Sequence, residues 1–155
     1  MGSDIHKIAN NNETAFFNAC RSGNETLVKY LLEKGAAVNL KNYYGKTLLF
    51  EACCSNNKTM VKYLVEQGAD INKENKDSEI PLFKVCQHGN NTLIKYLVEK
   101  GTDINKENKR GEIQLFEACR HRNNPLVKYL VEKGSDINKK NKYGETPPPL
   151  GSLSW

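Results

Sequence analysis

Apolar and polar positions recur along this chain with a period of 33 residues. In each period a short apolar stretch, such as Leu49–Cys53, follows helical spacing over about two turns, which predicts a short first helix. After a polar turn comes a longer stretch, such as Leu93–Val98, whose apolar residues form one stripe and predict a second helix. The pattern therefore predicts a repeated unit of two antiparallel helices joined to the next unit by a polar loop.

Single residue types mark the same points of successive units. Glycine, tyrosine, cysteine and asparagine each recur in register, at Gly35, Gly68, Gly101 and Gly134; Tyr30, Tyr63, Tyr96 and Tyr129; Cys20, Cys53, Cys86 and Cys119; and Asn39, Asn72, Asn105 and Asn138. Self-similarity at a period of this size is typical of supersecondary units that stack on copies of themselves. We therefore predict an all-α solenoid rather than a chain folded around one round core.

The residues at the turns fit this interpretation. Gly45, Gly111 and Gly144 mark a tight turn that needs positive φ, and Ser78 replaces glycine in the third copy. An asparagine precedes each second helix as a predicted N-cap. The recurring glycine just past each second helix is the usual left-handed C-cap. We expect short hairpins to project from the stack at the tight turns.

On these residues the chain resembles the ankyrin repeat family, whose unit has the same length and a motif of the form D-x-x-G-x-T-P-L-H-x-A-A, G-H, V-x-x-L-L-x-x-G-A-D-V-N. The closest matches are Thr47–Cys53, Ile80–Phe83, Val61–Val65 and Gly68–Asn72. Three departures from the motif are themselves periodic: its Asp becomes Asn42, Asn75, Asn108 and Asn141, its first His becomes Phe17, Phe50, Phe83 and Phe116, and its second Ala becomes the cysteine series. The resemblance implies an ankyrin solenoid with projecting β-hairpin turns.

The repeat pattern also divides the chain. We expect an N-terminal extension over 1–12, an array of about four repeats and the start of a fifth over 13–147, and an irregular tail over 148–155. The prolines at 147–149 and Gly151 prevent a complete fifth helix pair. We therefore expect a fragment of a longer array, or a tail that derives from cloning or from a change of reading frame. An exposed repeat face at this end leaves self-association open.

The cysteines, the apolar runs and the first residues of the chain indicate where the protein is located. Four of the five cysteines occupy equivalent positions in stacked helices, which lie 8–10 Å apart, whereas a disulfide needs Cα atoms within about 7 Å. They are interpreted as small buried apolar residues. No apolar run approaches the roughly 20 residues of a membrane helix, and the first residues lack the pattern of a signal peptide. An intracellular, cytoplasmic protein is expected, with the nucleus left open.

Candidate binding residues are those that vary between copies, because buried positions must repeat while a partner meets each copy with different atoms. By resemblance to the family, the most variable positions line the hairpin tips and the inner face of the first helices, the concave groove where ankyrin arrays bind proteins. The candidates are Tyr43, Tyr44, Lys46, Lys76, Asp77, Glu79, Gln87, His88, Lys109, Arg110, Glu112, Arg120, His121, Lys142 and Tyr143. For any single position, drift on a solvated surface is as good an explanation.

Two other series have structural interpretations. The tyrosines of the second helix are expected to pack between repeats rather than to stack on bases. Lys29, Lys62, Lys95 and Lys128 form a cationic row, but a glutamate four residues further along each helix is expected to neutralise it. The net charge of +5 is moderate and lacks the clustered Lys and Arg of a nucleic-acid surface.

Catalysis is not expected. A nucleophile, its base and an orienting group must converge, but most acidic residues and cysteines are copied through the repeats, and His6, His88 and His121 have no evident partner. There is no phosphate loop or paired C-x-x-C, so we predict neither a cofactor nor a metal. The predicted function is binding of a partner protein, which the sequence does not identify. The alternatives are a spacer segment of a larger ankyrin protein and a binder of nucleic acid or anionic surfaces.

Overall fold

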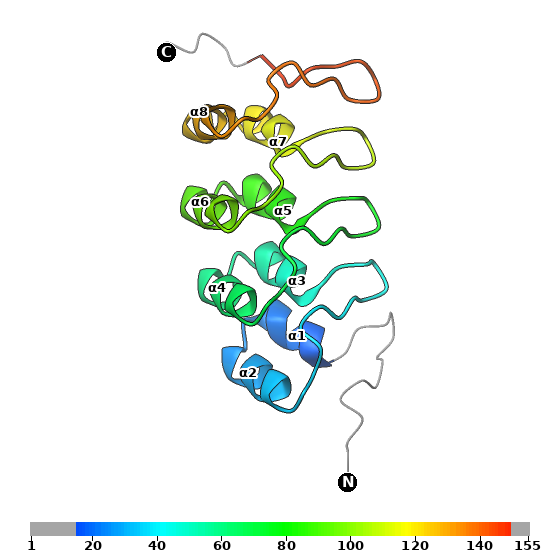
Figure 1. Cartoon of the computed structure of the whole chain (residues 1–155), viewed down its shortest axis with the longest axis vertical. Coiled ribbons are helices and arrows are strands. Elements are labelled where there is room, and N and C mark those ends of the chain that lie inside the picture. The colour runs from blue at the N-terminus through cyan, green and yellow to red at the C-terminus, as the bar shows by residue number, and fades with distance from the viewer. Residues whose placement is uncertain (1–14, 150–155) are drawn as a thin grey trace.

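The computed structural model describes residues 15–149 as a stack of four helix pairs (Figure 1). The helices are α1 (Ala15–Ser22), α2 (Glu25–Glu33), α3 (Leu48–Cys54), α4 (Lys58–Glu66), α5 (Pro81–His88), α6 (Asn91–Glu99), α7 (Gln114–Arg120) and α8 (Asn124–Glu132). The first helices form one layer and the second helices another (Figure 1). The expected extension over 1–12 and all but the first two residues of the tail over 148–155 lie outside the described part.

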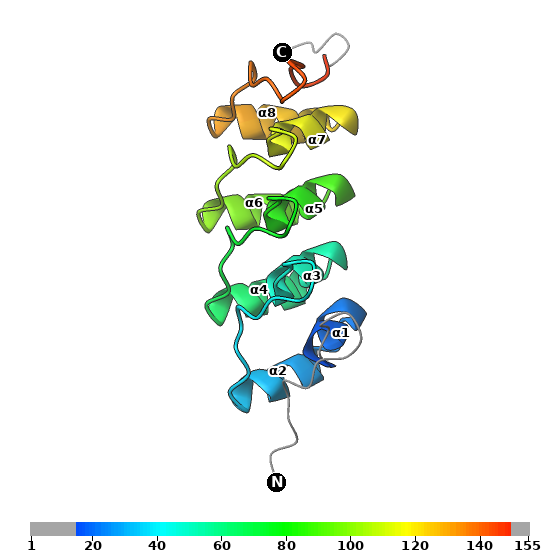
Figure 2. The ribbon, with the colours of Figure 1, turned by 90° about the vertical axis from the view of Figure 1, so that its right-hand side faces the viewer.

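The loops between pairs all project to the same side of the stack, on the right in Figure 1 and toward the viewer in Figure 2. They are the expected hairpin turns, and they are short: the described residues contain no strand and one isolated antiparallel bridge, between Lys41 and Thr47. Each loop tip closes through two backbone bonds of its own. In the first loop, Asn42 N–H donates to the Lys46 carbonyl at 3.0 Å and Gly45 N–H to the Asn42 carbonyl at 2.9 Å. Further bonds go to asparagine side chains and neighbouring loops.

Local chemistry sets the helix ends as the sequence predicts. Asn24, Asn57, Asn90 and Asn123 cap the second helices, each side-chain oxygen accepting from the backbone N–H three residues on at 2.9–3.2 Å. The glycine that follows each second helix has φ between 87° and 98°. Ser78 takes the same left-handed conformation as the turn glycines, with φ of 58°.

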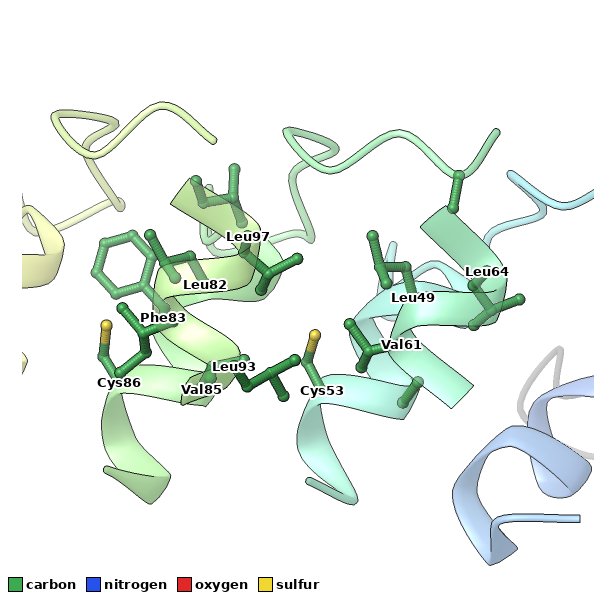
Figure 3. Close-up of a cluster of buried hydrophobic side chains, with 14 of the residues drawn as sticks. Leu49, Cys53, Val61, Leu64, Leu82, Phe83, Val85, Cys86, Leu93 and Leu97 are labelled. Carbon is green, nitrogen blue, oxygen red and sulfur yellow. The ribbon is translucent and has the colours of Figure 1, made fainter. Parts of the chain in front are cut away.

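The core is a continuous band between the two layers. Figure 3 shows side chains of α3, α4, α5 and α6 gathered around Cys53, Phe83 and Leu97. The phenylalanine at the motif's histidine position is fully buried in all four copies. The cysteine series is buried and unpaired, and burial raises the pKa of the Cys53 thiol well above its usual value. The cysteines therefore act as small apolar residues, as predicted.

Two side-chain series tie each repeat to the next. The first series consists of the side chains of Asn39, Asn72 and Asn105. Each donates an amide N–H to the carbonyl of the glycine that follows the second helix of the next repeat, at 3.0–3.3 Å. Each also accepts from the backbone N–H of the aspartate two residues after that glycine, at 2.8–3.2 Å. On the second helices, Lys29, Lys62 and Lys95 lie over the rings of Tyr63, Tyr96 and Tyr129, with Nζ 5.2–5.5 Å from each centroid. Tyr63, Tyr96 and Tyr129 therefore pack between repeats, as predicted, with lysines as partners, whereas Tyr30 of the first repeat is exposed.

Candidate functional site

Each projecting loop is built around one buried asparagine. The side-chain oxygen of Asn42 accepts from the backbone N–H groups of Tyr44 and Lys46, both at 3.0 Å, and the asparagines of the next three loops repeat this pair of bonds. An aspartate could make these bonds equally well. Asparagine adds an N–H donor, and in every loop this donor meets a glutamate: Glu51, Glu79, Glu112 and Glu145. The Asn for Asp exchange therefore brings a carboxylate to the base of each loop.

The loop tips are bonded to one another through the backbone. Lys76 N–H donates to the Tyr44 carbonyl, Lys109 N–H to that of Asp77, and Lys142 N–H to that of Arg110, each at 2.9 Å. Gly45 lies beside the next loop, where an added Cβ would come within 3.0 Å of the Lys76 nitrogen. The tips therefore hold fixed positions relative to one another. We call the tips and the adjoining exposed side of the first helices the loop-side surface.

An aromatic cluster occupies the first tip of this surface. Tyr43 and Tyr44 are 53% and 47% exposed, and their rings meet edge to face with centroids 5.4 Å apart. Lys76 of the next tip lies over the Tyr43 ring, with Nζ 3.8 Å from the centroid, and Lys46 lies 5.9 Å from that of Tyr44. These four predicted residues therefore form one contiguous patch.

A carboxylate lies beneath this patch. Glu51 on α3 is buried and accepts from Asn42, and Lys46 and Arg21 lie 3.7 and 3.4 Å from its carboxylate oxygens. Lys46 is consequently held against the protein by Glu51 on one side and by Tyr44 on the other.

The predicted basic residues of the C-terminal half lie beside acidic residues. Arg120 pairs with both Glu112 and Glu117, Arg110 lies 3.1 Å from Glu112, and His121 lies 3.6 Å from Glu117. Glu112 is only 2% exposed, so the structure does not place it where a partner could touch it, in contrast to the expectation. From its position two residues before α7, it pairs with both arginines and holds them in place.

Glu112 is ionised in the fold despite its burial. Burial alone would raise the pKa of its carboxyl, but the hydrogen bond and charge of Arg120 and the charge of Arg110 outweigh that effect and hold the pKa below its usual value of 4.5. Because the folded pKa is the lower one, the ionised carboxylate stabilises the fold above pH 4.5, and this contribution is lost as the pH falls through the folded pKa.

We expect Glu112→Gln to make the fold roughly 1–2 kcal/mol less stable at pH 7, because it removes the charge that pairs with Arg110 and Arg120. The loss is smaller than for a fully buried pair, because both arginines are partly exposed and solvent screens their charges. The variant should also lose less stability than the wild type as the pH falls below 4.5, because it lacks the titrating group. Urea unfolding at a series of pH values measures both effects. Glu145→Gln, which changes the exposed equivalent in the last loop, is the control. Parallel pH profiles for Glu112→Gln and wild type would contradict this role.

The remaining predicted residues lie on the loop-side surface with fewer contacts. Asp77, Lys109, Lys142 and Tyr143 are exposed at the tips, and Gln87 is exposed on α5. Glu79 is half-buried and lies 3.3 Å from Lys84. The His88 ring nitrogen lies 2.9 Å from the Cys54 carbonyl of the preceding repeat, which fixes the ring between repeats.

The sequence reasoning missed three residues that shape this surface: Glu51, Lys84 and Glu117. A signal for them was present, because they share one position of successive repeats, and the charge at this position changes sign. In the part of the chain that the structure describes, no cluster of three His, Cys, Asp or Glu residues could hold a metal ion, and no helix is long and apolar enough to cross a membrane.

A family model described as ankyrin repeats matches residues 1–75 and 67–141. The chain belongs to the ankyrin repeat family. No curated protein matches it. Ankyrin repeats are generally protein–protein interaction modules, and the family is typically non-enzymatic. Membership accounts for the stacked helix pairs and the projecting loops of this ankyrin array, while its asparagine, phenylalanine and cysteine series are its own variation on the repeat.

Proposed function

We propose that this ankyrin array binds a partner protein through its loop-side surface. The observation that supports this proposal is the exposed aromatic pair, Tyr43 and Tyr44, on a tip fixed by backbone bonds to its neighbour. Tyrosine and arginine are enriched among the residues that contribute most to protein interfaces. Neither ring is needed to fill the core, so both are available for a partner.

The rigidity of the surface adds to this argument. Ordering flexible loops and side chains on binding costs free energy that a preformed surface does not lose. Here each tip is closed by its asparagine and bonded to the next tip. Modest contacts spread over several tips should therefore give useful affinity.

The test is affinity capture from a native lysate of the source organism, followed by quantitative mass spectrometry. We expect the double variant Tyr43→Ala/Tyr44→Ala to retain a specific partner about tenfold less than the wild type, with Tm lowered by no more than a few degrees. Tyr30→Ala is the matched control, because Tyr30 is 54% exposed but lies on α2 in the other helix layer.

Two outcomes would contradict the proposal. Equal capture by wild type and the Tyr43/Tyr44 variant would move the binding site off this surface. Retention of no specific protein by any form would instead support the alternative in which the array spaces other domains of a larger ankyrin protein.

A further inference from the structure

The loop tips present one lysine per repeat at equivalent positions. Lys76, Lys109 and Lys142 are exposed, and each backbone nitrogen is bonded to the preceding tip at 2.9 Å. Because three successive bonds of the same kind connect the tips, the lysines form a row with the spacing of the repeats. We call these three residues the tip lysine row.

No member of the row has an acidic partner in the described part of the chain, whereas several other loop lysines bond to a carboxylate or a carbonyl of a neighbouring loop. Lys41 donates to the Glu74 carbonyl, Lys106 pairs with Glu74, and Lys139 pairs with Glu107. Within residues 15–149, the salt bridges do not include any member of the tip lysine row, and the Lys76 ammonium lies over the Tyr43 ring, 3.8 Å from its centroid. The charges of the row are thus free for an anionic partner.

The spacing of the row points to one backbone conformation in that partner. Packed helices of neighbouring repeats lie about 8–10 Å apart. A polyproline II segment has three residues per turn and rises about 3.1 Å per residue, so every third side chain returns to the same face after about 9.3 Å. A β-strand returns a side chain to the same face after two residues, or about 6.7 Å, which does not match.

The aromatic pair at the end of the row fits the same conformation. Polyproline II segments dock on exposed aromatic side chains, which accept the proline rings. Tyr43 and Tyr44 meet edge to face directly beside Lys76, so a segment that follows the row would pass over them. Tyr143 offers a second ring at the other end and is 73% exposed.

We propose that the tip lysine row binds an acidic segment of a partner protein in the polyproline II conformation, with a carboxylate at every third residue and a proline against Tyr43 and Tyr44. This inference rests on the proposed function and names the chemistry of the partner. A nucleic acid fits less well, because Asp77 and Glu145 adjoin the row at exposed positions and would repel a dense line of phosphates.

The test uses fluorescence anisotropy with three labelled peptides and one oligonucleotide. The first peptide contains four Glu-Pro-Pro triplets, the second has the same composition with its four glutamates contiguous, and the third replaces every glutamate with glutamine. The oligonucleotide is single-stranded oligo-dT of the same length. We expect the triplet peptide to bind the wild-type chain about tenfold more tightly than any other probe, because it alone places carboxylates opposite all three lysines.

Two variants locate the site. Lys76→Gln/Lys109→Gln/Lys142→Gln should weaken binding of the triplet peptide about tenfold. The matched control, Lys62→Gln/Lys95→Gln/Lys128→Gln, removes the same number of charges at the same one-per-repeat spacing from the second helices and should change binding less than twofold. Circular dichroism checks that both variants remain folded.

Equal affinity for the triplet and contiguous peptides would overturn the inference, because the register would then be irrelevant. Equal losses in the two triple variants would overturn it as well, and tighter binding of oligo-dT would favour nucleic acid. If no peptide binds while the Tyr43/Tyr44 variant still loses its captured partner, this inference fails and the proposed function stands.

Discussion

Phe83→Ala should lower the free energy of unfolding by about 3–5 kcal/mol, the cost of emptying a fully buried aromatic site. Phe83 is 1% exposed on α5, which packs against both α3 and α7 in the middle of the array. Each repeat contacts only its neighbours, so a central cavity weakens the coupling between the two halves. Because a domain of this size has a total stability of about 5–15 kcal/mol, the loss should be plain in urea or thermal unfolding followed by circular dichroism.

Phe83→Leu is the control for this prediction. Leucine keeps most of the side-chain volume, and exchanges of this kind usually cost less than about 1.5 kcal/mol. A cost for Phe83→Ala as small as that for Phe83→Leu would mean that the neighbouring helices collapse into the cavity. The phenylalanine series would then contribute little more than any medium-sized apolar residue.

The fold was predictable because its determinants are local and repeated. A glycine at positive φ after each second helix and an asparagine N-cap before it need only the residues of their own turn. Four copies of each signal fixed the register of the helices. The sequence did not show how the hairpin turns are held: besides their own backbone bonds, the loops form bonds with neighbouring loops and asparagine side chains.

The candidate surface was predictable only in part. Variation between copies selected the tips correctly as exposed positions, but it could not show which charges neutralise one another. Arg120 meets Glu112 across eight residues of sequence, and His88 meets the carbonyl of Cys54 one repeat away. Such pairs depend on how helices and loops are placed in space, so Glu112 was taken as a surface residue although it is buried.

The lysine row of the second helices shows the same limit. The spacing of four residues predicted pairs between each lysine and a glutamate of its own helix. The structure places Lys29, Lys62 and Lys95 over tyrosines of the following repeat instead. A helix face in a stack offers partners on the neighbouring helix, and a pattern read along one helix does not include them.

Replacing Gln114 with an apolar residue should stabilise the array. Gln114 is the first residue of α7 and is 0% exposed, and neither its amide nitrogen nor its amide oxygen has a hydrogen-bond partner. A buried polar group without a partner costs about 1–3 kcal/mol. Three of the four equivalent residues of other repeats are apolar and buried, Leu48, Pro81 and Pro147, and the fourth, Ala15, is exposed at the start of α1.

The chain itself supplies the two replacements. Gln114→Pro copies the Ile80–Pro81 pair, since Ile113 has nearly the same extended backbone as Ile80 (φ −98° and ψ 169°, against −91° and 162°). Proline suits the first position of a helix, where the N–H has no acceptor within the helix. Gln114→Leu copies Leu48 and keeps more of the side-chain volume.

We expect both Gln114 variants to raise the free energy of unfolding by about 1–3 kcal/mol, which corresponds to roughly 2–4 °C in Tm for each kcal/mol in a chain of this length. Gln87→Leu is the matched control, because it makes the same exchange at an exposed position of α5 and should change stability by less than about 0.5 kcal/mol. A fall in Tm for both Gln114 variants would show that the amide is satisfied in solution, with an ordered water as its partner. Buried waters of that kind are costly to remove, so the sign of the change in Tm distinguishes an unpaired amide from a hydrated one.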